Sequence, residues 1–153
     1  MKKKISIIIP FFNEKDNLPK ILSEVKKLIE IESKYIFEII LTDNNSNDGS
    51  SIIAKEELKN FSNSKYIKLS RNFGYQANIK AGYDHCTGDA AVQLDADGED
   101  DPKIISDFIK EWENGNDVVY GIREIRKENF FLSFLRNIFY IFLKKFSDLD
   151  IPE

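Results

Sequence analysis

The run of residues 5–9, ISIII, limits the fold of this chain more than any other feature of its sequence. Four of these five residues are isoleucine, and only Ser6 interrupts them. A strand with one face in water alternates apolar and polar residues, whereas a continuous apolar run is typical of a parallel strand that helices cover on both faces. We therefore expect a buried parallel strand at residues 5–9, which Pro10 ends, in a protein of the α/β class.

The rest of the chain alternates predicted helices and strands. Segment 17–31 has apolar residues at steps of three and four, which indicates an amphipathic helix with Asp16 or Asn17 as its N-cap. Further strands are expected at 37–42, 66–69, 90–94 and 118–120, and further helices from near Ser50, at 76–85 and at 102–114. This alternation predicts a mostly parallel sheet flanked by helices, with right-handed crossovers.

Composition and charge exclude several classes of protein. The length of 153 residues suits about one domain, and a content of 42% hydrophobic and 31% charged residues is typical of globular proteins rather than disordered ones. A net charge of −4 argues against a nucleic-acid partner, because affinity for phosphate backbones comes from excess Lys and Arg. The single Cys86 can form no disulfide within the chain, and the apolar start breaks at Pro10, so we expect a cytoplasmic protein.

Polar side chains follow four of the predicted strands. They are Asn13 and Glu14 after the first strand, residues 43–48 after the second, 70–72 after the third and 95–101 after the fourth. Ligands of open parallel sheets bind beyond the carboxyl ends of the strands, so these segments predict one polar rim. The chain has neither G-x-G-x-x-G nor G-x-x-x-x-G-K-[ST], so a bound nucleotide would have no glycine-rich loop around its phosphates.

The stretch DADGEDD at 95–101 holds five acidic residues. Carboxylates repel a diphosphate unless a hard divalent cation with oxygen ligands neutralises both. Asp95 and Asp97 suit such a cation, because they are one residue apart where a strand opens into a loop and only the small Ala96 separates them. The alternative is a solvated acidic turn, which a D-x-D pair by itself does not exclude.

Five segments together carry a resemblance to a known family. These are IIIPFFNE, LTDNNSNDGS, SRNFGYQANIKAGYDHCTGD, QLDADGEDDP and VVYGIREIRKENF. In this order and spacing they resemble inverting glycosyltransferase family 2, and more narrowly its polyprenyl-phosphate branch, which includes dolichyl-phosphate mannose synthase and bacterial undecaprenyl-phosphate glucosyltransferases. The resemblance implies a GT-A fold, which is Rossmann-like and binds nucleotide-diphospho-sugars, a UDP- or GDP-sugar donor, and Mg2+ or Mn2+.

The resemblance also assigns roles around the donor. It puts Pro10, Phe11, Asn13 and Glu14 against the base and ribose, with Asp43 reading base or sugar hydroxyls and Asn44 where the family often has a second acid. Arg71 belongs to the SRNFG segment that lines the donor pocket, although a surface ion pair is the alternative, and Asn72 and Gly74 are expected to shape that loop.

The acidic pair takes its role from the same resemblance. Asp95 and Asp97 match the residues that hold metal and diphosphate, Ala96 packs against the nucleoside, and Glu99 is a further metal ligand where relatives often carry Gln. His85 and Cys86 have no metal-ligand partner at a suitable spacing and are expected to be structural.

Catalysis by inversion needs a nucleophile in line with the leaving diphosphate, whose charge the metal at Asp97 would stabilise. A lipid phosphate is already ionised and needs cations to place it, and Arg123, Arg126 and Arg136 suit this task, with surface salt bridges as the alternative. A hydroxyl acceptor would need a carboxylate base, for which the sequence offers no distinct candidate outside the acidic stretch.

We divide the chain into a GT-A catalytic core, residues 1–125, and an acceptor-side segment, residues 126–153. The Phe-rich stretch 130–145 carries Arg136, Lys144 and Lys145, which suits a helix lying on a membrane surface and a core helix of a longer protein equally well. Relatives continue beyond DIPE at 150–153, so we expect a truncated catalytic domain.

The function expected is transfer of a sugar from a UDP- or GDP-sugar to a polyprenyl phosphate at the inner face of the membrane, where the protein would be peripheral. One alternative is a nucleotide-sugar binding fragment or regulatory module without turnover. Another is a family 2 enzyme that acts on a glycan hydroxyl in cell-surface polysaccharide synthesis. Homo-oligomerisation stays open.

Overall fold

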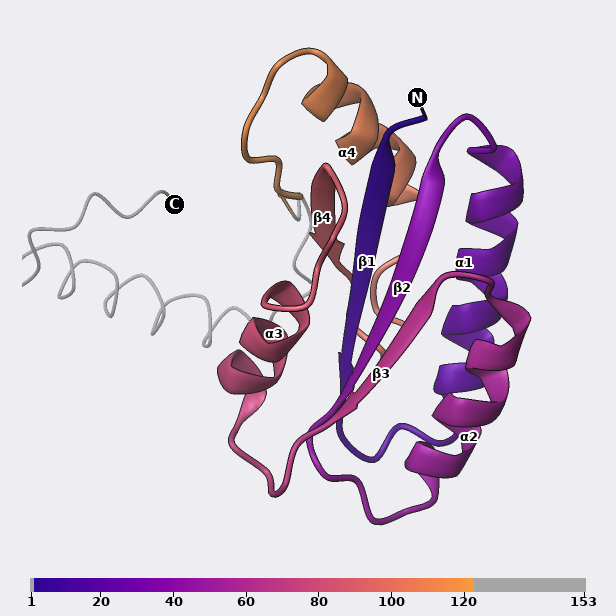
Figure 1. Ribbon diagram of the computed structural model, residues 1–153, viewed down its shortest axis with the longest axis vertical. Coiled ribbons are helices and arrows are strands. Elements are labelled where there is room, and N and C mark those ends of the chain that lie inside the picture. Colours follow the sequence, from indigo (N-terminus) through magenta and orange to yellow (C-terminus); the bar gives the residue numbers. More distant parts are fainter. Residues whose placement is uncertain (1, 123–153) are drawn as a thin grey trace, which may run out of the picture. The chain divides into compact units, whose positions relative to one another are not determined.

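Four parallel strands form one sheet in the order β3-β2-β1-β4. They are β1 (Lys4–Phe11), β2 (Ile36–Asp43), β3 (Ser64–Lys68) and β4 (Ala90–Gln93). This computed structural model describes residues 2–122 (Figure 1). The chain separates into two units, residues 1–119 and 120–153, and every helix and strand described here lies in the first. The expected mostly parallel α/β sheet is thereby confirmed.

Helices occupy both faces of this sheet (Figure 1). They are α1 (Leu18–Ile31), α2 (Ser50–Glu57) with the short 3-10 helix η1 (Leu58–Asn60) after it, α3 (Tyr75–Tyr83) and α4 (Ile104–Glu113). Odd-numbered residues of β1 and β2, such as Ile7 and Leu41, pack in one apolar cluster with residues of α1, α2 and α4. The even-numbered Ile8 and Thr42 face α3, where their side chains are the nearest neighbours of Gly82.

The first strand is two residues longer at its carboxyl end than the sequence suggested, because Pro10 does not end it. Even-numbered residues of β1 bond toward β4, as the hydrogen bond from Leu94 N to Ile8 O shows. Pairing of β1 with β4 stops at Ile8, whereas pairing with β2 continues to Phe11. Pro10 faces the side of β1 on which pairing with β4 has already stopped. Its missing N–H therefore removes no hydrogen bond of the sheet, and β1 continues through it.

The start of α1 also differs from the expected side-chain cap. Asn17 is the N-cap residue, but its backbone is helical and its side chain makes no capping hydrogen bond. Instead the Asn17 amide donates to Glu14 Oε2 at 2.8 Å, and Leu18 N donates to the Glu14 carbonyl at 2.9 Å. The turn beginning at Glu14 thus supplies acceptors at the helix start, and Pro19 in the first turn has no N–H that would need one.

The predicted strand at 118–120 is wrong for the part of the chain that the structure describes, where β4 is an edge strand. Val118 and Tyr120 are 79% and 69% exposed and belong to no ladder. Their apolar character suits a strand, but β propensity depends on packing against a neighbouring strand, and these residues pair with none of the strands between residues 2 and 122. Among residues 2–122 we find no helix with the length and hydropathy needed to cross a bilayer.

Candidate functional site

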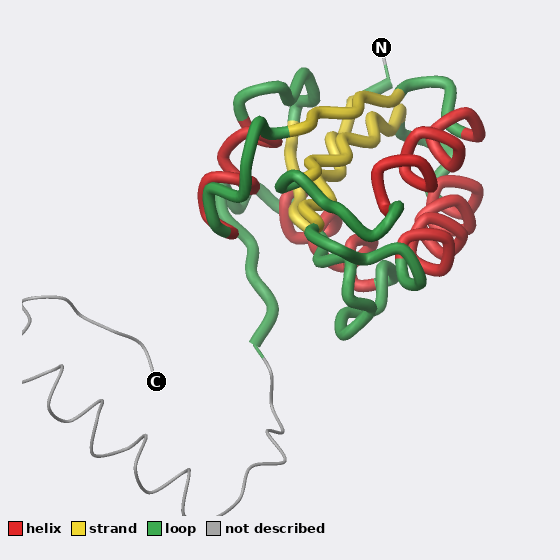
Figure 2. The backbone as a smooth tube through the Cα atoms, turned by 90° about the horizontal axis from the view of Figure 1, so that it is seen from below, coloured by secondary structure: helices red, strands yellow, loops and turns green. Residues whose placement is uncertain are grey.

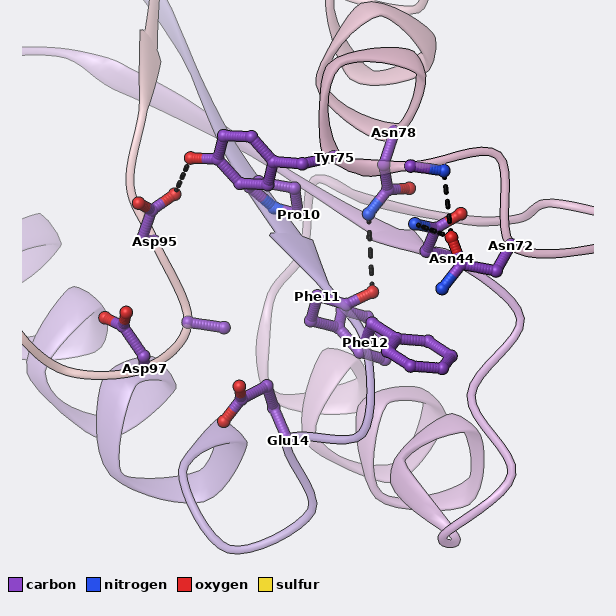
Figure 3. A pocket seen from close by; sticks show the side chains of 12 residues that line it. Pro10, Phe11, Phe12, Glu14, Asn44, Asn72, Tyr75, Asn78, Asp95 and Asp97 are labelled. Carbon is purple, nitrogen blue, oxygen red and sulfur yellow. Dashed lines mark hydrogen bonds between the residues drawn. The ribbon is translucent and has the colours of Figure 1, made fainter.

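The loops that follow the strands gather at the carboxyl end of the sheet, the end that faces the viewer in Figure 2. There a pocket of about 390 Å³ opens between β1, β2, β4 and the start of α3 (Figure 3). This volume is in the range of small-ligand sites. The pocket is lined by Pro10, Phe11, Phe12, Glu14, Asn44, Asn72, Gly74, Tyr75, Asn78, Asp95, Ala96 and Asp97.

Seven residues expected at the donor site line this one pocket, namely Pro10, Phe11, Glu14, Asn44, Asp95, Ala96 and Asp97. In Figure 3, Asp95, Asp97 and Glu14 lie to one side of Phe11, and Asn44 and Asn72 lie to the other. Residues separated by more than 80 positions in the sequence are brought together because parallel strands end at the same edge.

Four other expected residues do not line the pocket: Asn13, Asp43, Arg71 and Glu99. Arg71 is exposed, and its guanidinium stacks 4.6 Å from the centre of the Phe73 ring. Glu99 is exposed and lines a neighbouring depression instead. Arg123, Arg126 and Arg136 lie outside the described residues, as does the segment 126–153.

Asn13 joins two of the loops beneath the pocket. Its φ of 59° is left-handed, a conformation that Asn adopts more readily than most residues. Its backbone N–H donates to Ser46 Oγ at 2.9 Å, and its Oδ1 accepts from Asn47 N at 3.0 Å. Asn13 thereby fixes the loop after β1 to the loop after β2, a structural task that supports the neighbouring Glu14.

Asp43, the last residue of β2, is fully buried. Its carboxylate accepts hydrogen bonds from the Ser51 hydroxyl, from Ser46 N at 2.6 Å and from Tyr66 OH at 2.7 Å. Burial would raise the pKa of this carboxyl, but the donated hydrogen bonds outweigh it, and the pKa lies below its ordinary value. We expected Asp43 to contact the base or sugar, but its carboxylate is buried and does not line the pocket. The neighbouring Asn44 lines the pocket instead.

Asn44 holds the segment that leads into α3. Its side-chain Nδ2 donates to Asn72 Oδ1 at 3.0 Å, and its Oδ1 accepts from Phe73 N at 2.9 Å. Asn72 Oδ1 also accepts from Gly74 N at 2.8 Å, and Gly74 has a φ of 86°, which favours glycine. Asn72 and Gly74 therefore shape this loop, as the sequence predicted, and line the pocket as well.

The carboxylate of Asp95 is held by two neighbours. Tyr75 OH donates to Asp95 Oδ1 at 2.5 Å, and Gln93 Nε2 donates to the same oxygen at 3.1 Å and to Tyr75 OH at 2.6 Å. Burial, followed by the hydrogen bond to Asp95, raises the pKa of the Tyr75 phenol well above its ordinary 10.0. Tyr75 is therefore a neutral donor at physiological pH.

The two acidic residues suit a cation that a substrate helps to bind. Among residues 2–122, no group of three His, Cys, Asp or Glu is placed to hold a metal ion by itself. Asp95 and Asp97 nevertheless line the same pocket, and Asp95 Oδ2 accepts no hydrogen bond from the described residues. Mg2+ commonly binds through one or two carboxylates together with phosphate oxygens of its substrate, and Asp95 and Asp97 supply the carboxylate part of such a donor set.

Three pocket residues were missed by sequence reasoning: Phe12, Tyr75 and Asn78. Phe12 lies within the PFFNE segment and is 41% exposed at the pocket. Tyr75 and Asn78 are three positions apart in α3, but the helix predicted from the sequence began only at residue 76, and nothing local indicates that this face meets the strand ends.

A comparison with protein families identifies the chain. The family model described as glycosyl transferase family 2 matches residues 6–151. The chain is 36% identical over 148 residues to the uncharacterized glycosyltransferase YkcC of Bacillus subtilis (strain 168), covering 96% of this chain and 46% of YkcC. It is 35% identical over 130 residues to the undecaprenyl-phosphate 4-deoxy-4-formamido-L-arabinose transferase of Salmonella choleraesuis (strain SC-B67), covering 84% of this chain and 39% of that protein. The chain thus spans less than half the length of these relatives.

Solved structures agree on the fold. S. aureus TarS, residues 1–349, superposes with a TM-score of 0.62 at 19% identity, over 82% of this chain and 40% of that one. The mannosyltransferase PcManGT of Pyrobaculum calidifontis, in complex with GDP-Man and Mn2+, superposes with a TM-score of 0.56 at 19% identity, over 63% of this chain and 28% of that one. These likenesses confirm the expected GT-A fold. Because the family model covers nearly the whole sequence, the chain belongs to glycosyl transferase family 2.

Proposed function

We propose that this chain binds a nucleoside-diphosphate sugar, UDP- or GDP-linked, in the pocket at the carboxyl end of the sheet and transfers the sugar with inversion to a polyprenyl phosphate. The observation that carries the proposal is that Asp95 and Asp97 line the same pocket as Pro10, Phe11 and Asn44. One cavity thus combines an acidic pair, which a cation could link to a diphosphate, with a wall of apolar and amide side chains.

The wall of the pocket suits the nucleoside part of the donor. Phe11 is buried and Phe12 is partly exposed, so an aromatic surface borders the pocket floor. Glu14 supplies a carboxylate suited to hydroxyl or N–H groups of a ribose or base, and Asn44, whose amide bonds to Asn72 and Phe73, fixes the wall beside it. These side chains would orient the donor and hold its diphosphate toward Asp95 and Asp97.

In this proposal the acidic pair binds the cation. Asp95 and Asp97 would hold Mg2+ or Mn2+, which when bound neutralises charge on the leaving diphosphate. The solved structure of PcManGT with GDP-Man and Mn2+ supports this combination, as a property of that protein. Glu99 is exposed outside the pocket, so we assign the cation to Asp95 and Asp97 alone.

The acceptor and the location belong to the same proposal. A relative at 35% identity is named as an undecaprenyl-phosphate transferase, and a polyprenyl phosphate supplies an ionised oxygen that needs little base catalysis. Arg123 and Arg126 would place this phosphate. Such a lipid acceptor implies a protein that is peripheral to the inner face of the membrane, and the aromatic and basic stretch 130–145 suits this location.

Titration calorimetry tests the donor site. UDP, GDP and their sugar conjugates are titrated with and without Mn2+ into the wild-type chain and into Asp97→Asn. We expect Mn2+-dependent binding of one nucleotide family, which the variant loses. Asp107→Asn is the matched control, because it makes the same change of charge on the exposed surface of α4. Absence of binding to folded wild-type chain would refute the proposed donor site.

Sugar transfer is then measured by mass spectrometry with the donor identified in this way. Product on undecaprenyl phosphate but not on oligosaccharide hydroxyls supports the proposed acceptor. Product on a glycan hydroxyl would instead support polysaccharide synthesis, and donor binding without product on either would support a binding module.

A further inference from the structure

The carboxylate of Asp95, at the pocket, is held by hydrogen bonds from two neighbouring side chains. Its Oδ1 accepts hydrogen bonds from the Tyr75 hydroxyl at 2.5 Å and from Gln93 Nε2 at 3.1 Å. Its Oδ2 accepts no hydrogen bond from any of the described residues. We infer that Tyr75, assisted by Gln93, is a positioning residue that orients Asp95 for the cation. This inference rests on the proposed function, because it needs a cation at Asp95.

The placement of Tyr75 depends on residues from three strand ends. Tyr75 is the first residue of α3, and the preceding Gly74 is oriented by Asn72, which Asn44 holds in turn. Asn44 follows β2, whereas Asp95 follows β4 on the far side of β1. The phenol therefore connects the start of α3, which the loop after β2 holds through Asn44, to the acidic loop after β4 (Figure 3).

The hydrogen bond from Tyr75 to Asp95 matters because an aspartate side chain without such a partner populates several rotamers. A cation site with only two protein carboxylates loses much of its affinity when one of them must be ordered on binding. A phenol and an amide on Oδ1 fix the carboxylate before the cation arrives and leave Oδ2 available to it. Partners of this outer kind typically contribute about 10- to 100-fold to metal affinity.

A hydrogen-bond donor can also weaken binding of the cation, because it competes with the cation for the same carboxylate oxygen. The two effects predict opposite results for removal of the hydroxyl. If positioning dominates, Tyr75→Phe weakens binding of the cation. If competition dominates, the same change strengthens it. The observation that favours positioning is that both hydrogen bonds from described residues go to Oδ1 and none goes to Oδ2.

The test measures Mn2+ binding through the decrease of the electron paramagnetic resonance signal of free Mn2+, in the presence of saturating UDP or GDP, whichever binds. We expect Tyr75→Phe to raise the Kd of Mn2+ about tenfold and Gln93→Leu to raise it less. Nucleotide affinity measured in EDTA should stay unchanged, since the aromatic ring remains in the pocket. Tyr83→Phe, at the other end of α3, is the matched control and should bind Mn2+ as the wild-type chain does.

The outcomes separate the inference from the function on which it rests. If the wild-type chain binds Mn2+ with nucleotide, Asp97→Asn does not, and Tyr75→Phe binds as well as wild type or better, the positioning role is refuted and the donor site stands. If the folded wild-type chain binds no Mn2+ with either nucleotide, both are refuted. A loss of nucleotide affinity in EDTA for Tyr75→Phe would mean that the hydroxyl contacts the nucleotide, which also refutes a role confined to Asp95.

Discussion

Glu38 in β2 has a carboxylate that is almost completely buried far along the strand from the pocket. Lys65 Nζ lies 2.9 Å and Lys4 Nζ 3.3 Å from Oε1, and Ser6 Oγ donates to Oε2 at 2.8 Å. Burial would raise the pKa of Glu38, but hydrogen bonds from Lys65, Ser6 and Thr87 outweigh it and lower the pKa from 4.5 to about 2.

A lowered carboxyl pKa makes stability depend on pH in one direction. The contribution of ionised Glu38 to the free energy of unfolding is complete above pH 4.5, its value when unfolded, and declines as the pH falls toward 2. We expect Glu38→Gln to lower the free energy of unfolding at pH 7 by about 1–3 kcal/mol. Urea denaturation at pH 7 and pH 3 checks this. An equal loss at both pH values would contradict an ionised Glu38, and Glu111→Gln on the surface of α4 is the control.

Asn78 connects α3 to both central strands at the pocket. Its Nδ2 donates to the Phe11 carbonyl at 3.3 Å and to the Thr42 carbonyl at 2.9 Å, and among the described residues its Oδ1 has no hydrogen-bond partner. The orientation of the amide is therefore set by two carbonyl acceptors. Asn78 is thus a structural residue that also forms part of the pocket lining.

Replacing this amide by an acid should be worse than deleting it. Asn78→Ala should cost about 1–3 kcal/mol of unfolding free energy, because two carbonyls lose their donor. Asn78→Asp would set a buried carboxylate against those carbonyls, so we expect a larger loss at pH 7 that shrinks as the carboxyl is protonated below pH 5. Chemical denaturation at both pH values measures this. Gln76→Glu, exposed on the same helix, should have little effect, and equal stability of the two Asn78 variants would contradict the assigned bonds.

At the scale of elements, α3 lies unusually close to the sheet at Gly82. A Cβ at this position would lie 2.3 Å from Ile8 Cγ2 and 3.4 Å from Thr42 Cγ2. Ile8 and Thr42 are both fully buried, so neither can move aside freely. The glycine is therefore required by packing, although it is the poorer helix former.

Gly82→Ala tests which of these effects dominates. Helix propensity alone would favour alanine by about 1 kcal/mol, whereas overpacking of a buried contact costs about 1–3 kcal/mol. We expect a net destabilisation, measured as a lower midpoint of urea denaturation. Lys80→Ala should change little, since it removes only an exposed ion pair with Asp84. A variant more stable than wild type would mean that α3 can move away from the sheet.

At the scale of the whole molecule, the described residues that line the donor pocket all lie between positions 10 and 97. The residues proposed for the acceptor, Arg123 and Arg126, come later in the sequence and outside the described range. The two substrates should therefore respond separately to mutation.

The double variant Arg123→Ala and Arg126→Ala tests this separation. We expect Mn2+-dependent nucleotide binding within about twofold of wild type, and binding of undecaprenyl phosphate in detergent micelles weakened about tenfold or more, because each lost charge-assisted hydrogen bond to phosphate is worth about 1.5–3 kcal/mol. Lys26→Ala and Lys27→Ala together, on the exposed surface of α1, remove the same charge as a control. Unchanged lipid binding would contradict the assigned acceptor contacts.

The sequence by itself determined the class of the fold and much of the site. The apolar runs of β1 and β2 and the spacing of apolar residues in α1 depend on local patterns, which repeat with the period of each element. Because parallel strands place their carboxyl ends at one edge, the same patterns were enough to bring Pro10, Asn44 and Asp95 together.

Only the tertiary structure decided which side chains at that edge face the pocket. It buried Asp43 under Ser51 and Tyr66, placed the buried Asn44 in the pocket wall, and brought Tyr75 to Asp95. It also let β1 continue through Pro10, and left residues 118–120 without a partner among the described strands. Each of these outcomes depends on contacts between residues distant in sequence, and no local periodicity or propensity contains information on such contacts.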